Sequence, residues 1–290
     1  MKERMARSLH FAIAALLVLS ALSDTMAHGP LHERLRQSTA KIAESPADPL
    51  GYVARARLHR EHRDLASART DLQKALELAP QLREAAGAMA DLLLFEGKPS
   101  EALEWACRAH SGENPSVEVR RVYARALTLD GQGETALPIY DALIDDLPTP
   151  TPELYLERYR TARLAHEEDL SIALQGLRTA IEKMGAVPSL VLPAIDLERE
   201  LGQFDAALRN VARMCEPSAR KTPWLVLESE ILLQAGRVLE AQEKARIALD
   251  FLERDPRRES RANLRLRVRA DRVVIDANLS DGDLPAKEKR

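Results

Sequence analysis

Apolar residues in the central part of the chain recur with the spacing of amphipathic helices. Ala68, Leu72 and Ala75 are four and three residues apart, so they share one face of a helix. Pro80 ends that helix, because proline cannot continue the hydrogen-bond ladder. An upstream stretch, 52–59, has the same spacing. The pattern predicts a helix, a short turn, a second helix and a proline within 34 residues.

This unit repeats along the chain, because a small residue returns at a nearly constant interval. The interval is 34 residues, except for one interval of 37. The series is Ala68, Ala102, Ala136, Ala173, Ala207 and Ala241. A period of this length is typical of a solenoid, in which each repeat packs on its neighbours. We expect the three extra residues in the proline-rich stretch 147–152, and the least regular stacking there.

Small residues have two roles in this unit. Alanine allows the two helices of a hairpin to approach closely. Gly97, Gly131, Gly202 and Gly236 stand where each first helix ends, and we expect them to adopt the left-handed conformation that glycine tolerates.

The offsets of these residues resemble the tetratricopeptide repeat, whose pattern is a large residue, Leu-Gly, Tyr, Ala, Phe and Pro at fixed positions. The matching residues are Tyr52, Ala56, His59, Ala68, Leu72, Ala75 and Pro80; Ala90, Leu93, Gly97, Ala102, Ala106 and Ala109; Ala124, Leu127, Gly131, Ala136, Tyr140 and Pro148; Leu164, Ala173, Leu177 and Ala180; Gly202, Ala207, Val211 and Met214; and Gly236, Ala241, Ala245 and Ala248. The sequence departs from the pattern at Arg55 and Glu157, which replace bulky apolar residues. The resemblance implies an all-α, right-handed superhelical solenoid of antiparallel helix pairs, with about six repeats.

The expected organisation follows from this register. It comprises a signal peptide (1–27), an N-terminal capping helix (28–48), a solenoid (49–255) with repeats at 49–82, 83–116, 117–150, 154–187, 188–221 and 222–255, a C-terminal capping helix (256–279) and a disordered tail (280–290).

The N-terminus has the features of a secretory signal peptide. Three basic residues precede an apolar core at 11–22, and Thr25 and Ala27 are small residues at the cleavage positions. The apolar core is shorter than the ~20 residues of a membrane-spanning helix. We predict cleavage after Ala27 and a periplasmic or secreted protein without stable membrane insertion; an uncleaved anchor is the alternative.

Composition narrows the function. Cleavage would remove three basic and two acidic residues and change the formal net charge from −3 to −4, which argues against nucleic acid as a partner. Cys107 and Cys215 lie three repeats apart, too far for a disulfide, and are expected to be small buried residues. No phosphate loop, nucleophile elbow or Cys-x-x-Cys motif is present, so we predict a protein that is not an enzyme and needs no cofactor.

The C-terminal segment can form a helix with one apolar face. Leu266, Ala270 and Val273 share that face, while arginines occupy the others. A polar outer face is what a terminal cap of a solenoid needs. The alternation over 264–270 would also suit a strand.

Charged residues on the first helices are the candidate binding site. The resemblance implies that first helices line a concave face, with Asp91, Asp196, Glu200 and Glu230 along it. The candidate partner-binding residues are Arg57, Arg60, Arg121, Arg125, Arg158 and His166. Clustered guanidinium groups can hold carboxylates in bidentate fashion. This is similar to the clamp by which some tetratricopeptide proteins hold an acidic C-terminus, but the asparagine of that clamp is missing. The arginines are otherwise only a solvated face.

A second candidate site is the mature N-terminus. After cleavage the chain would begin at His28, whose amine and imidazole could bind one copper or zinc ion with His32. His59 and His62 could form another weak pair.

Three functions remain open. The leading hypothesis is an exported, non-enzymatic scaffold that binds a protein or peptide segment in its groove, an acidic one if Arg121, Arg125 and Arg158 act together. The alternatives are a metal-handling accessory protein that uses His28 and His32, and a non-catalytic subunit of an exported enzyme complex.

Overall fold

The protein is described over residues 31–282 by a computed structural model, and every described segment of regular structure is helical. The predicted signal peptide and the last eight residues of the predicted tail lie outside the described residues. Consecutive helices pack against each other as pairs, which confirms the predicted all-α helix-pair solenoid.

The chain divides inside one helix into two compact units, residues 1–139 and 140–290. Unit 1 contains a helix over 31–44, α2 (Pro49–Glu61), α3 (Leu65–Leu78), α4 (Arg83–Phe95), α5 (Pro99–His110), α6 (Val117–Leu129) and the first half of α7 (Gly133–Asp146). Unit 2 contains the rest of α7, α8 (Pro152–Ala165), α9 (Ser171–Met184), α10 (Pro188–Glu200), α11 (Phe204–Cys215), α12 (Thr222–Gln234), α13 (Val238–Arg254) and α14 (Arg261–Gly282).

Unit 1 is built from hairpins whose first helices lie side by side. α2 pairs with α3 and α4 with α5, while α2, α4 and α6 also contact one another in order. Ala68, Leu72 and Ala75 are all but inaccessible to solvent, as their spacing predicts. The alanines of the ladder therefore lie at the contact between the two helices of a hairpin.

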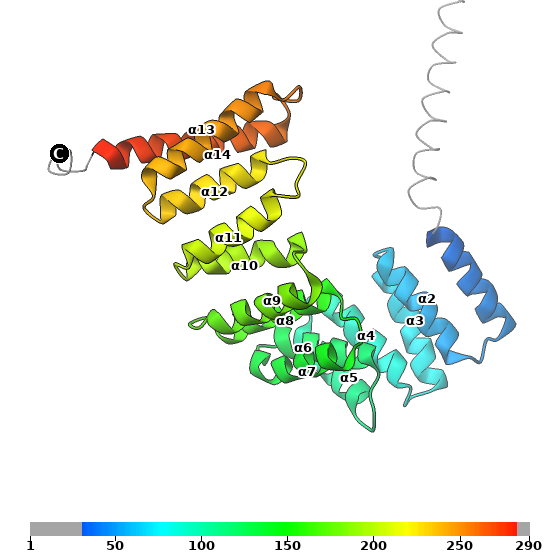
Figure 1. Ribbon diagram of the computed structural model, residues 1–290. Coiled ribbons are helices and arrows are strands. Elements are labelled where there is room, and N and C mark those ends of the chain that lie inside the picture. Colours follow the sequence, from blue (N-terminus) through cyan, green and yellow to red (C-terminus); the bar gives the residue numbers. More distant parts are fainter. Residues whose placement is uncertain (1–30, 283–290) are drawn as a thin grey trace, which may run out of the picture. The chain divides into compact units, whose positions relative to one another are not determined.

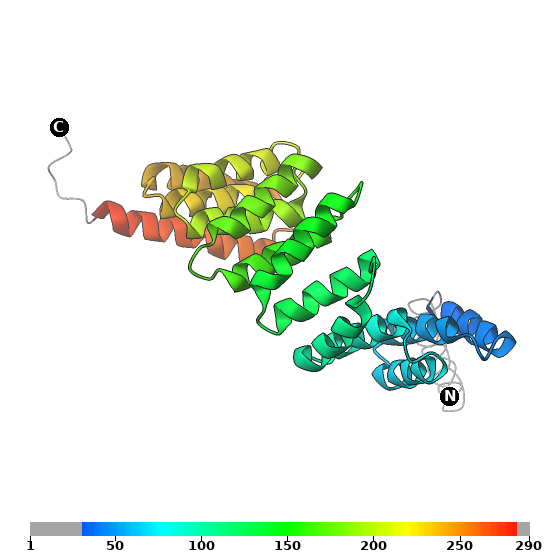
Figure 2. The ribbon, with the colours of Figure 1, turned by 90° about the horizontal axis from the view of Figure 1, so that it is seen from below.

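Unit 2 follows the same plan and ends with a longer helix. The pairs are α8 with α9, α10 with α11, and α12 with α13, and α14 packs on both α12 and α13. Figure 2 shows α14 in red at the end of this stack. The stretch 264–270 is helical, not a strand, and the helix continues to Gly282, so the predicted tail begins three residues too early.

Local signals set the helix boundaries. Asp64 accepts a hydrogen bond from the Ser67 amide at 3.1 Å and caps α3. Gly97, with φ of 75°, ends its first helix in the left-handed conformation, and the three other predicted glycines do the same. In the first repeat Arg63 takes this position, with φ of 61°.

An ion pair replaces the expected apolar contact in the first repeat. Arg55 donates two hydrogen bonds to Asp71, at 2.8 and 2.7 Å, across the α2–α3 hairpin. The Asp71 side chain is 7% exposed. These hydrogen bonds raise the pKa of Arg55. A buried carboxylate thus explains how an arginine is accommodated at a position that usually holds an apolar residue.

The cysteines are free thiols, but the expectation that both are buried was wrong. Cys107 is exposed and Cys215 is half-buried. Ala102, Ala106 and Ala109 form the buried stripe of α5, and Cys107 lies off that stripe. Burial raises the pKa of Cys215.

No helix in residues 31–282 is long and apolar enough to cross a membrane.

Candidate functional site

The same position on each first helix of unit 1 holds a charged residue, and these residues form a row. The ninth residues of α2, α4 and α6 are Arg57, Asp91 and Arg125. Because these helices lie side by side, the three residues belong to one face of the unit. This is the face on which the candidate groove was predicted.

Asp91 joins three repeats. One oxygen, Oδ2, lies 2.7 Å from Nη1 of Arg60 on α2, and the other, Oδ1, lies 2.9 Å from Nη1 of Arg125 on α6. The Asp91 side chain is 16% exposed, and the two arginines are 29% and 35% exposed. The carboxylate is therefore shared, and one net positive charge remains on the group.

A small pocket lies beside this group. Its volume is about 70 Å³, which holds a side chain but falls below the ~300–1,000 Å³ of small-molecule sites. The pocket is lined by apolar or small residues and by polar or charged ones that form its rim. The first group is Gly87, Ala88, Val119 and Val122, and the second is Arg57, Arg60, Glu84, Asp91, Ser116 and Glu118. The charges on this rim are of both signs, so the groove is not simply basic.

Two further predicted residues occupy different surroundings in unit 2. Arg158 of α8 donates hydrogen bonds to Asp141 of α7, and its side chain is 17% exposed. It lies against Gly176 of α9, where a side chain would displace it. His166 ends α8 in the turn before α9. Arg121, the remaining predicted residue, lies half-buried in α6, one turn before Arg125.

The structure places Arg160, not Arg158, at the ninth position of α8. The distance from the first residue of α8 to Ala173 is two residues longer than the matching distance in the other repeats. The third extra residue of the alanine ladder precedes α8. The turn 166–170 has five residues where the other repeats have three. The insertion is therefore mainly in this turn and not in the stretch 147–152.

Acidic residues take the ninth positions that follow in unit 2. Asp196 of α10 is exposed, and Glu230 of α12 accepts two hydrogen bonds from Arg269 of α14, at 2.7 and 2.6 Å. Hydrogen bonding to Glu230 raises the pKa of Arg269. Glu200 accepts two hydrogen bonds from Arg163, at 3.0 and 3.2 Å.

Sequence reasoning missed Arg163, which lines a wider cavity of about 550 Å³ in unit 2. Tyr159, Leu164 and Glu200 also line it. Arg163 donates to the Tyr159 hydroxyl at 3.2 Å. The repeat register could have identified Arg163. It is the twelfth residue of α8, and Arg60 is the twelfth residue of α2.

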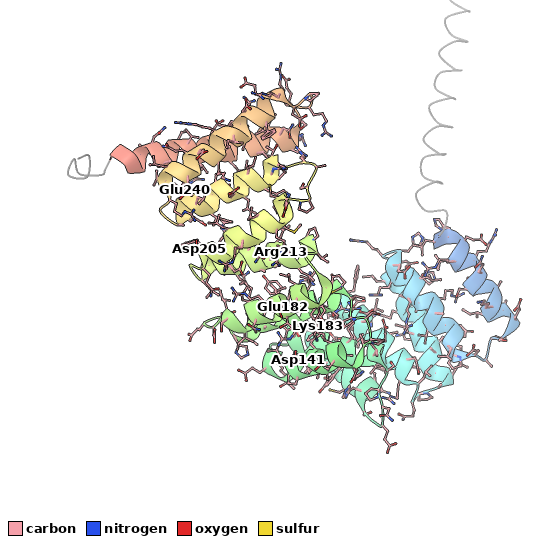
Figure 3. All side chains as sticks on the ribbon, viewed as in Figure 1. Asp141, Glu182, Lys183, Asp205, Arg213 and Glu240 are labelled. Atoms are coloured by element: carbon pink, nitrogen blue, oxygen red, sulfur yellow. The ribbon has the colours of Figure 1, made fainter. Side chains whose placement is uncertain are left out.

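The second helices of unit 2 present scattered charges. Figure 3 labels six exposed side chains there, which are Asp141 of α7, Glu182 and Lys183 of α9, Asp205 and Arg213 of α11, and Glu240 of α13. Four of these six residues are acidic and two are basic, a mixture of signs that is usual on a solvated face.

The predicted metal ligands are only partly described. His28 lies outside the described residues. The centroid of the His32 ring lies 4.6 Å from the centroid of the His62 ring, and His62 belongs to the turn after α2. In the part of the chain that the structure describes, no group of three or more His, Cys, Asp or Glu residues could hold a metal ion. The two-histidine site stays a prediction.

No protein-family profile matches the sequence, and no curated protein matches it. Solved structures do resemble the chain. The C-terminal part of a TPR repeat-containing protein from Cytophaga hutchinsonii gives a TM-score of 0.58 at 14% identity, over 81% of this chain and 96% of that one. PilW, a type IV pilus biogenesis factor, gives a TM-score of 0.54 at 16% identity, over 73% of this chain and 96% of that one.

A tetratricopeptide repeat protein from Parabacteroides merdae ATCC 43184 gives a TM-score of 0.51 at 15% identity, over 88% of this chain and 95% of that one. The fold is that of the tetratricopeptide repeat. At these identities the likeness concerns the fold alone, so the role of the groove depends on its own residues.

Proposed function

We propose that this protein is an exported, non-enzymatic scaffold that binds a segment of another protein in the groove of unit 1. The observation that carries the proposal is the small pocket beside Asp91, with an apolar floor and a rim of fixed charges. Such a surface can bind one anchoring side chain and orient the backbone around it.

The size of the pocket favours a protein segment over a small molecule. A volume of about 70 Å³ accommodates one aliphatic side chain. Val119 and Val122 offer that side chain an apolar contact, and both are at least nine-tenths buried. The partner would therefore dock an aliphatic residue into a preformed site.

The charges on the rim specify what flanks that residue. Asp91 already binds Nη1 of Arg60 and Nη1 of Arg125. A carboxylate of the partner must therefore compete with Asp91 for these two atoms or bind elsewhere. Arg57 is exposed on the same rim and is the best placed to receive it. We propose an aliphatic residue close to a carboxylate as the recognised pattern, with Arg121 as a secondary candidate in the same unit.

The test uses a substitution that narrows the pocket without weakening the fold. In Gly87→Ala the added methyl group would lie 3.5 Å from Val119 Cγ2 and 3.7 Å from Ala109 Cβ, which are ordinary contacts. Alanine inside a helix should stabilise the protein by about 0.5–1 kcal/mol. We expect the melting temperature to rise and partner binding to fall.

Binding is measured by photo-crosslinking in the native compartment. A photoreactive residue at position 57 should trap a partner, whereas one at Glu104, which is exposed on the second helix α5, should not. Gly87→Ala should reduce the adduct at position 57. Unchanged crosslinking in a variant that is more stable would rule out the pocket.

A second variant tests the charge pattern. Asp91→Asn removes the carboxylate that Arg60 and Arg125 share, so it should strengthen capture of an acidic segment. If capture instead weakens while the melting temperature is retained, Asp91 itself contacts the partner, and the recognised segment is basic.

A further inference from the structure

The last described helix, α14, is anchored through one stripe of side chains. Leu266, Ala270 and Val273 are buried in a cluster with residues of α12 and α13. Ala277 is fully buried on the same side. This stripe holds α14 at the end of unit 2.

The opposite side of α14 is also apolar, and it is exposed. Leu264, Val268, Ile275 and Leu279 are 46%, 68%, 57% and 66% exposed. At 3.6 residues per turn, the four side chains lie within about 60° of one another around the helix. The expectation that the outer face of this cap is polar is therefore wrong in part, because the arginines lie along the edges of an apolar stripe.

The position of α14 explains why this side is open. It packs on the preceding pair, α12 and α13, much as α4 packs on α2 and α3. The helix α4 is then covered by its own partner, α5, but no described helix of unit 2 covers the free side of α14. The stripe is therefore open to solvent in the described part of unit 2.

The stripe is complementary to itself. Its residues are spaced by four, seven and four positions, which is symmetric about the midpoint of the stripe. If two copies meet with their α14 helices antiparallel, Leu264 faces Leu279 of the second copy, and Val268 faces Ile275 of the second copy. A twofold interface requires this reciprocity between residue positions.

The charged edge of the stripe agrees with the same register. Arg272 has its own counter-charge in Asp276, at 3.5 Å, so two copies of Arg272 near the twofold axis are each partly neutralised. Arg265 lies on the same edge. In the antiparallel pair, its offset along the helix axis from Asp276 of the second copy is only two residues, or about 3 Å. On this edge the antiparallel pairing adds opposite charges beside the apolar contacts, whereas on the other edge the two copies of Asp271 come near the twofold axis.

We propose that α14 docks a second copy of this chain, and that the two α14 helices pack antiparallel across a twofold axis. Each copy then covers the exposed stripe of the other. This inference concerns unit 2 and is independent of the groove in unit 1.

Sedimentation equilibrium on the purified protein tests the association. We expect a mass twice that of the monomer, and a monomer for the double variant Val268→Glu with Ile275→Glu. A matched control, Leu239→Glu with Leu129→Glu, changes residues that are 72% and 54% exposed outside the stripe and should remain a dimer. Unchanged circular dichroism in all variants shows that they fold.

Disulfide trapping tests the register, in a background with Cys107→Ser and Cys215→Ser. A mixture of Val268→Cys and Ile275→Cys chains should form a crosslinked pair between the two variants, while neither variant should crosslink with itself. Efficient self-crosslinking of Val268→Cys would indicate parallel helices and overturn the proposal. A wild-type monomer, or a dimer that survives the double glutamate variant, would also overturn it. A monomer that sediments with phosphatidylglycerol vesicles would assign the stripe to a lipid surface instead.

Discussion

Single carboxylates hold the charged residues of unit 1 in place. Asp71 binds Arg55 inside a hairpin, and Asp91 binds arginines from the repeats on either side of its own. Charge-assisted hydrogen bonds of this kind are directional, so they position the guanidinium groups as well as neutralise them. An arginine that the sequence presents as a candidate binding residue is thereby assigned to a structural role.

His110 gives unit 1 a dependence on pH. Its ring stacks on Tyr123, with centroids 4.4 Å apart, and burial together with Arg83 and Arg120 lowers its pKa from the ordinary value of 6.5. The folded protein therefore favours the neutral ring, while the unfolded chain takes up a proton more readily. This contribution to stability is present above about pH 6.5 and is lost as the pH falls below it.

We predict that His110→Gln reduces the loss of stability between about pH 7.5 and about pH 5.5. The free energy of unfolding is measured by urea denaturation at both pH values, for the variant and the wild type. An equal loss in the two proteins would show that His110 does not cause the acid sensitivity.

At the scale of the element, the turn between the helices of a pair depends on backbone conformation. Gly97 has φ of 75° and no atom within 4 Å of the place where a Cβ would be. Substitution there introduces strain but no clash. Gly87, in the middle of α4, is an ordinary helical residue with space for a methyl group.

The same substitution should therefore have opposite effects ten residues apart. Gly97→Ala should destabilise the protein by about 1–2 kcal/mol, because alanine disfavours the left-handed conformation, while Gly87→Ala should stabilise it. Thermal and urea denaturation of both variants give the comparison. A stable Gly97→Ala protein would mean that the turn can adopt another conformation, as Arg63 shows that glycine is not obligatory in the first repeat.

At the scale of the whole molecule, we predict that the proposed scaffold acts outside the cytoplasm. The basic start, the apolar core at 11–22 and the small residues Thr25 and Ala27 are the basis for this prediction. An exported protein would meet its partner in the periplasm or the medium, which is where crosslinking should be carried out.

We predict a mature chain that begins at His28. Intact-mass spectrometry of the exported protein measures this directly. Ala27→Asp should block processing and leave the longer chain associated with the membrane, because the cleavage site requires a small residue. A full-length protein in the cytoplasmic fraction would contradict export.

The helix pairs were predictable because they depend on local patterns. The Ala68, Leu72 and Ala75 stripe, the glycines of the turns and the prolines all act within a few residues. The row at the ninth positions followed from the register only in part. The register gave Arg57 and Arg125, but it pointed to Arg158 instead of Arg160 because the ladder could not show where the extra residues lie. The role of these residues in binding stays a prediction. The place of the extra residues in the turn 166–170 depends on how α8 and α9 pack.

The sequence alone determined the repeat period, the all-α class and the buried alanine stripe of the second helices, since these follow from side-chain spacing along a helix. Only the tertiary structure decided which carboxylate holds which arginine, because such pairs join residues 16 to 39 positions apart. It also revealed the second apolar stripe of α14. A hydrophobic pattern marks residues that favour burial, but whether a neighbour covers them depends on the packed molecule.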